Sequence, residues 1–237
     1  MTEARRVNST STTSAPLQEV ALSQNEIESL SMKAVRGAGF SWGLAEEAGS
    51  AIGWLARAGI DGAAPLLALL SAKHAIPPEE GRPVPSPGYW RCATEAPLCP
   101  ITTGAAILDH ARLTDGPIRL ATRLEAVAEP LLLLPFVARA ASICEQALLM
   151  EWPQGRLAIA SNGSFDREEA LLLLQQPTVT LTLRPVAAVA PMRLTATQCL
   201  GIAEATIEGL NRFALQTTVP ATEASRSGAG SNSTDND

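Results

Sequence analysis

The sequence predicts an α+β fold, with an N-terminal helical bundle followed by a mixed, mostly antiparallel sheet with flanking helices. Three observations support this prediction. Apolar residues recur at helical spacing through residues 21–75, a proline-rich segment interrupts the chain at 76–100, and short apolar runs with turn signals follow at 101–218. Helices that come first, followed by strands mixed with helices, are typical of an α+β protein.

The helical part has clear start and stop signals. Ser23 and Glu26 have the spacing of a capping box, in which each side chain binds the other residue's backbone N–H, so a first helix is predicted from there. A second helix is expected near Ser41, with Gly59 as its end. Asp61 is expected to cap a third helix. The short loops between them indicate a small bundle.

The segment 76–100 contains seven prolines, together with Tyr89 and Trp90. A loop of this length inside a compact domain is usually either functional or a linker. We expect it to lie folded over the core and to connect the helical part to the α+β part.

The part at 101–218 carries both strand and helix signals. Apolar runs at 148–152 and 157–160 flank a Pro-Gln-Gly turn and predict a β-hairpin. Alternation of Thr with apolar residues at 178–183 predicts a strand that is buried on one face. Helices are expected at 137–146, 167–174 and 197–216.

Both ends of the chain have the composition of tails. Residues 1–20 are rich in Ser, Thr and Asn, and residues 219–237 are rich in Gly and Ser, so disorder is predicted for both. The C-terminal tail has a second interpretation. In this interpretation the tail is a strap that wraps a site, and Arg226 holds a carboxylate or phosphate there.

The net charge of −6 argues against a surface for nucleic acid or for anionic membranes, since both need clustered Lys and Arg. No apolar stretch of signal-peptide length follows Arg5 and Arg6. The most apolar run, at 131–134, is far shorter than a membrane span. Four cysteines without paired spacing indicate reduced thiols, so a cytoplasmic protein is expected.

The stretch Arg36-Gly-Ala-Gly39 is the first candidate site. A glycine-rich turn before a helix can present backbone N–H groups to an anion, and the Arg36 guanidinium adds further donors. The alternative is an ordinary helix C-terminus. Glu46 and Glu47 are candidates for a general acid/base or a metal ligand, with a solvated first helical turn as the alternative.

Asp109 and His110 form the second candidate, a proton-transfer pair, because His titrates near neutral pH and needs a partner that sets its tautomer. Cys92 and Cys99 with one His have zinc-ligand chemistry, but their spacing matches no zinc motif, so no metal site is predicted. No cofactor motif is recognised.

The runs RGAGFSWGLAEEAG and WLARAGIDG, the middle ILDHA and the ending VPATEASRSGAGS with TDND resemble a bacterial family catalogued only as a domain of unknown function. The resemblance extends over about residues 20–237. It implies no known activity, but it implies that the C-terminal tail belongs to the functional protein.

A weaker resemblance, over some 40 residues, is to the malate/L-lactate dehydrogenase family whose nicotinamide-binding fold is not Rossmann. The helix ending in ARAGIDG carries it. That family has Ser-His-Gly after the Asp, whereas Asp61 here is followed by Gly62-Ala63-Ala64. The catalytic histidine is absent at this place, so the resemblance does not imply a dehydrogenase.

The leading functional hypothesis is a protein that binds a small anionic metabolite and is a candidate to transform it. Arg36 and Arg226 would hold the anionic group, Trp42 would form an apolar wall, and Asp109 with His110 would transfer protons. The alternative is a non-catalytic accessory or interaction subunit of an oligomer, because small residues at 48–53 suit close helix contacts. A homo-oligomer is compatible with either hypothesis.

Overall fold

The computed structural model describes residues 18–72, 80–192 and 196–217. Their helices and strands follow each other in the order β1 (Glu19–Ser23), α1 (Gln24–Gly37), α2 (Trp42–Arg57), α3 (Ala63–Ala72), β2 (Pro83–Val84), β3 (Tyr89–Cys92), α4 (Pro100–His110), β4 (Thr122–Ala128), η1 (Pro130–Leu133), α5 (Leu134–Ile143), β5 (Leu148–Trp152), β6 (Gly155–Ile159), α6 (Arg167–Leu171), η2 (Leu172–Gln175), β7 (Thr178–Pro185), β8 (Cys199–Ala203), α7 (Glu204–Ala214) and η3 (Leu215–Thr217). The α+β prediction is confirmed. Among these residues no helix is long and apolar enough to cross a membrane.

The strands form two sheets. Six strands have the order β2-β3-β4-β7-β5-β6, and their pairs are antiparallel except for the parallel pair β3–β4. The predicted hairpin and the predicted strand at 178–183 are β5–β6 and β7. The second sheet pairs β1 with β8, which brings together two ends of the described chain.

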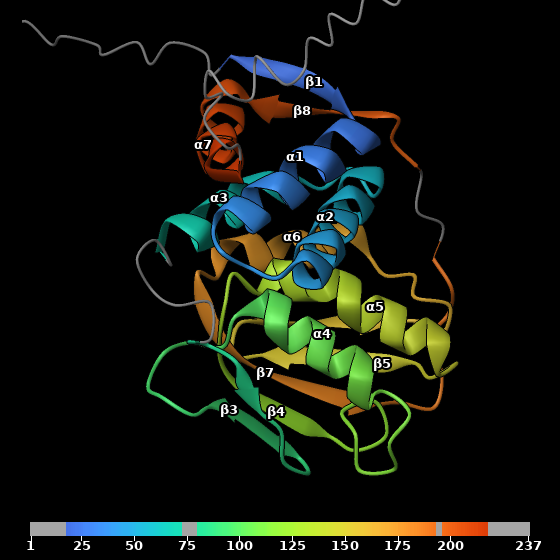
Figure 1. Cartoon of the computed structure of the whole chain (residues 1–237). Coiled ribbons are helices and arrows are strands. Elements are labelled where there is room, and N and C mark those ends of the chain that lie inside the picture. The colour runs from blue at the N-terminus through green and yellow to red at the C-terminus, as the bar shows by residue number, and fades with distance from the viewer. Residues whose placement is uncertain (1–17, 73–79, 193–195, 218–237) are drawn as a thin grey trace, which may run out of the picture.

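The described helices all lie on one side of the six-stranded sheet (Figure 1). α4 and α5 rest on the sheet, α1 and α2 lie over them, and α7 packs against α1. One continuous apolar core joins these layers. The opposite face of the sheet carries no helix of the described chain, as expected for strands that alternate between buried and exposed residues.

The predicted start signals of the first three helices are confirmed. The Ser23–Glu26 capping box is complete, and the Ser41 hydroxyl accepts the N–H of Leu44. Asp61 accepts the N–H groups of Ala63 and Ala64 at the start of α3. These residue types stabilise helix starts because their oxygens replace acceptors that the first turn lacks.

The prediction of one helix over 197–216 is wrong in its first part. Cys199–Ala203 is the strand β8, and the helix α7 begins only at Glu204. The apolar periodicity continued into this stretch, but pairing with β1 satisfies its backbone groups instead. The segment 76–100 also holds regular structure, because β2 and β3 lie within it. Residues 1–17, 73–79, 193–195 and 218–237, with His74 and Arg226 among them, lie outside the described residues.

The contact between α4 and α5 gives a test of this packing. A Cβ atom added at Gly104 would overlap the ring of Phe136, so Gly104→Ala is expected to destabilise the fold by about 1–3 kcal/mol. Gly43→Ala is the matched control, because a Cβ there meets nothing within 4 Å. Its effect is expected to stay within about 1 kcal/mol of neutral, on the stabilising side. Urea denaturation measures both, and equal stabilities of the two variants would contradict the close packing of α4 on α5.

Candidate functional site

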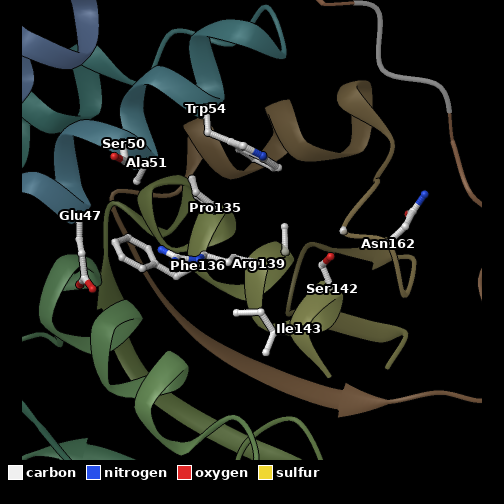
Figure 2. Close-up of a pocket in the computed structure, with 12 residues that line it drawn as sticks. Glu47, Ser50, Ala51, Trp54, Pro135, Phe136, Arg139, Ser142, Ile143 and Asn162 are labelled. Atoms are coloured by element: carbon white, nitrogen blue, oxygen red, sulfur yellow. The ribbon is translucent and has the colours of Figure 1, made fainter. Parts of the chain in front are cut away.

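A groove runs between α2 and α5 and holds a hollow of about 350 Å³ (Figure 2). That is within the range of small-ligand sites. The residues that line it come from three segments: Glu47, Ser50, Ala51 and Trp54 from α2, Pro135, Phe136, Ala138, Arg139, Ser142 and Ile143 from α5, and Asn162 and Gly163 from the loop after β6.

The α2 side of the groove follows from the helix pattern. Gly49 and Gly53 face α1, where an added Cβ would lie 2.9 Å from the Glu28 carbonyl oxygen or 2.8 Å from its carboxylate. Close packing on that side leaves Glu47 and Trp54 on the other side of the helix, while Ser50 stands between the two sides and donates its hydroxyl to the Glu28 carboxylate at 3.0 Å. Residues three, four and seven positions apart share a helical face, so these three side chains line one wall.

The α5 side begins with Pro135, which suits the first turn of a helix because that turn needs no donor from its N–H. Phe136, Arg139 and Ile143 then share a face at spacings of three and four. Phe136 is buried, whereas Arg139 and Ile143 are exposed. The α5 wall is therefore apolar at its base and carries one positive charge.

The far end of the groove is closed by the loop after β6. Gly163 has a φ of 80°, and an added Cβ would lie 2.8 Å from the Ala138 carbonyl oxygen, so this position favours glycine. Asn162 uses its side-chain oxygen to accept hydrogen bonds from Ser164. Trp54 packs against Phe165 with ring centroids 5.2 Å apart, which fixes its indole beside the hollow.

Glu47 and Arg139 both line the groove, and Asp109, outside the lining, adds its charge to their surroundings. Burial raises the pKa of Glu47, the nearby charge of Arg139 lowers it, and the carboxylate of Asp109 raises it further. Within the described part of the chain, Glu47 and Arg139 form no hydrogen bond or ion pair with each other. Because the Glu47 carboxylate and the Arg139 guanidinium are not paired with each other, their acceptor and donor atoms remain available to a bound molecule.

The predicted residues Arg36 and Trp42 lie together, away from this groove. The Arg36 guanidinium donates to the Phe40 carbonyl oxygen at 2.7 Å and stands 5.5 Å from the centroid of the Trp42 ring. Trp42 is 60% exposed. Arg36 thus stabilises the turn between α1 and α2, and its role as an anion ligand stays a prediction.

The predicted pair Asp109 and His110 is divided between two surroundings, because consecutive helical residues point about 100° apart. Asp109 is exposed and adds to the charge around Glu47. The His110 Nδ1 lies 2.9 Å from the Ala106 carbonyl oxygen, and its ring meets Trp90 edge-on at 5.4 Å. His110 is thus held by its own helix, and its proton-transfer role stays a prediction.

Cys92 and Cys99 are both buried. Burial raises the pKa of the Cys92 thiol, but hydrogen bonds from the Thr94 hydroxyl and from nearby backbone N–H groups outweigh burial and lower it. Among the described residues, no group of three or more His, Cys, Asp or Glu side chains is arranged to hold a metal ion.

Local sequence patterns favour a solvated helical turn for Glu47, and they do not point to Arg139, Trp54 or Phe136 as site residues. One signal was present for Arg139. It is the only charged residue in the largely apolar stretch 131–143. A single charge in such a helix marks a position where the helix leaves the core and faces solvent or a ligand.

Comparison with known protein families gives a match to part of the chain. Residues 22–96, about a third of the chain, match the model of a family described as protein of unknown function (DUF3726). The predicted resemblance to a domain of unknown function is confirmed over this segment, and the match does not extend to the C-terminal tail. No curated protein and no solved structure matches the chain. The α2 wall of the groove lies inside the matched segment, and the α5 wall lies outside it.

The raised pKa of Glu47 predicts a pH-dependent stability. A carboxyl whose pKa is higher in the folded state stabilises the fold while it is protonated, and this contribution is lost as the pH rises through the folded-state pKa. Glu47→Gln keeps the shape without the charge, so its stability relative to the wild type is expected to increase between about pH 4 and about pH 7.

Denaturant unfolding of the wild type and E47Q at both pH values measures this difference. Glu46→Gln is the control, because Glu46 is exposed at the preceding position of the same helix. A stability difference that is the same at both pH values for E47Q would show that the Glu47 carboxyl is not buried by the groove.

Proposed function

We propose that the protein binds a small polar metabolite in the groove between α2 and α5, with an anionic group of the ligand on Arg139. The observation that carries the proposal is that Arg139 and Glu47 line the same largely apolar hollow of ligand size, without an ion pair between them. The ligand class is the one expected from the sequence, a small anionic metabolite, but the proposed site differs from the one expected there.

The groove offers each part of such a ligand a complementary surface. The guanidinium of Arg139 is exposed, and its planar set of N–H donors suits a carboxylate or phosphate. Trp54, Phe136 and Ile143 provide apolar area for the ligand's body. The Ser142 hydroxyl and the Asn162 side-chain N–H donors supply neutral hydrogen-bonding groups along the sides.

Glu47 gives this groove its second charged contact. When ionised it accepts a hydrogen bond from a hydroxyl or ammonium group, and when protonated it donates one. A half-buried carboxyl with a raised pKa is also the kind of group that exchanges protons with a bound molecule. Any transformation of the ligand would therefore use Glu47.

The alternative function, an accessory or interaction subunit, is supported by a different observation. The face of the six-stranded sheet that points away from the described helices is left uncovered by them. A partner on that face is compatible with ligand binding in the groove, because the two surfaces lie on opposite sides of the sheet.

A thermal-shift screen with small carboxylates and phosphates tests the main proposal, because a ligand that binds the folded state raises the melting temperature. For a compound that binds, Arg139→Ala is expected to weaken the affinity about tenfold or more, since a hydrogen bond to a charged group contributes roughly 1.5–3 kcal/mol. Arg119→Ala is the matched control, because Arg119 is exposed on the loop after α4, outside the residues that line the groove.

Calorimetric titration of the wild type, R139A and R119A with the same compound gives the dissociation constants. A compound that binds R139A and the wild type with equal affinity would move the site away from the groove. A screen without any stabilising anion would contradict the proposed ligand class.

A further inference from the structure

The face of the six-stranded sheet that the described helices leave uncovered (Figure 1) has a regular charge pattern. Four exposed arginines lie on it, at positions 91, 123, 156 and 184, in a protein whose net charge is −6. Two glutamates accompany them. Glu125 accepts a hydrogen bond from the Tyr89 hydroxyl, and Glu151 pairs with Arg184 at 3.1 Å. The charges are therefore mixed along the face rather than gathered at one end.

Strand register places five residues of this face in one row across the sheet. Tyr89 on β3 is paired with Arg123 on β4, and Arg123 is paired with Thr182 on β7. Thr182 is paired with Glu151 on β5, and Glu151 with Arg156 on β6. Residues opposite each other in a sheet point to the same face. The row therefore reads Tyr, Arg, Thr, Glu, Arg across neighbouring strands.

When this row is laid over a copy of itself read in the opposite order, each charged residue meets a residue that it attracts. Thr182 on β7 stands at its centre, with two residues of the row on either side. A second copy, turned by a two-fold axis that lies between the two sheets and parallel to β7, places its row in the opposite order over the first. Arg123 then faces the partner's Glu151, and Arg156 faces the partner's Tyr89. Symmetry repeats both contacts, since a two-fold interface is made of the same patch on both subunits.

We infer that the uncovered sheet face binds a second copy of this chain, with the two-fold axis parallel to β7 and over Thr182. Face-to-face sheets pack about 10 Å apart, a distance that Arg and Glu side chains from opposite sheets bridge together. Two Arg–Glu ion pairs then flank the axis. Two stacked contacts between Arg and Tyr close the outer edges, where a guanidinium over an aromatic ring is attractive.

Arg184 lies near Thr182 on the same strand and would meet the partner's Arg184 at the axis. Its Nε atom is held by the Glu151 carboxylate at 3.1 Å, which draws the guanidinium toward β5 and away from the axis. Each Arg184 therefore keeps a carboxylate beside it. Both oxygens of the Glu151 carboxylate accept from Arg184, at 3.1 Å and 3.4 Å, and each oxygen keeps a second lone pair for the partner's Arg123.

The size of this face sets the expected strength. Five strands at their usual spacing, each about five residues long, cover roughly 24 Å by 17 Å. Such a footprint, about 400 Å² on each partner, is roughly half of a standard interface between proteins and is in the range of weak or transient contacts. The dimer is therefore expected to be in equilibrium with the monomer and to weaken with salt, because its central contacts are ion pairs near the surface.

Paired charge-reversal variants test the arrangement. In R123E, the new carboxylate faces the partner's Glu151 at both symmetric contacts, and in E151R two positive groups face each other. Each variant alone is expected to be monomeric. An equimolar mixture restores two opposite-charge pairs per dimer, so it is expected to form heterodimers. Sedimentation equilibrium over a concentration series up to the millimolar range, at low salt, measures the masses.

R212E is the control, because Arg212 is exposed on α7, on the helical side of the protein. It is expected to dimerise like the wild type. Circular dichroism melts show that each variant is folded. A monomeric wild type at every concentration overturns the inference, and so does a wild-type dimer that survives R123E or a variant mixture that stays monomeric.

Discussion

The close approach of α1 and α2 controls where the other helices can pack. Gly49 and Gly53 bring the two helix backbones together at Glu28 and Met32, where larger residues would collide. This contact fixes which face of α2 is left for α5, and therefore which side chains line the groove. The Arg36 bond to the Phe40 carbonyl oxygen stabilises the turn that joins the two helices.

The helical side and the strand side of the protein present different chemistry because they are built differently. On the helical side, the packing of α2 against α5 is incomplete. It leaves a hollow with an apolar base and a few charges at its edge. On the strand side, alternation places every second residue in solvent, so the exposed chemistry is a regular pattern of Arg, Glu and Thr. A hollow suits a small molecule, and a flat patterned face suits another protein surface.

How much could be predicted from the sequence depended on the range of the interaction. The caps at Ser23, Ser41 and Asp61 are contacts within four residues, and the β5–β6 hairpin closes through a short turn, so local patterns were sufficient for both. The strand β8 was mistaken for helix because its partner β1 lies about 180 residues earlier in the chain. Arg139 and Glu47 are separated by more than 90 residues, and no local pattern relates them.

Short-range hydrogen bonds and periodicity were enough to establish the α+β class, the starts of the first three helices and the alternation of the strands from the sequence alone. Which charged residues meet was decided by tertiary packing. Packing placed Arg36 on a turn, separated Asp109 from His110, and brought Arg139 to Glu47. Such side-chain encounters depend on how helices and strands pack together, and that packing is a property of the whole chain that periodicity does not contain.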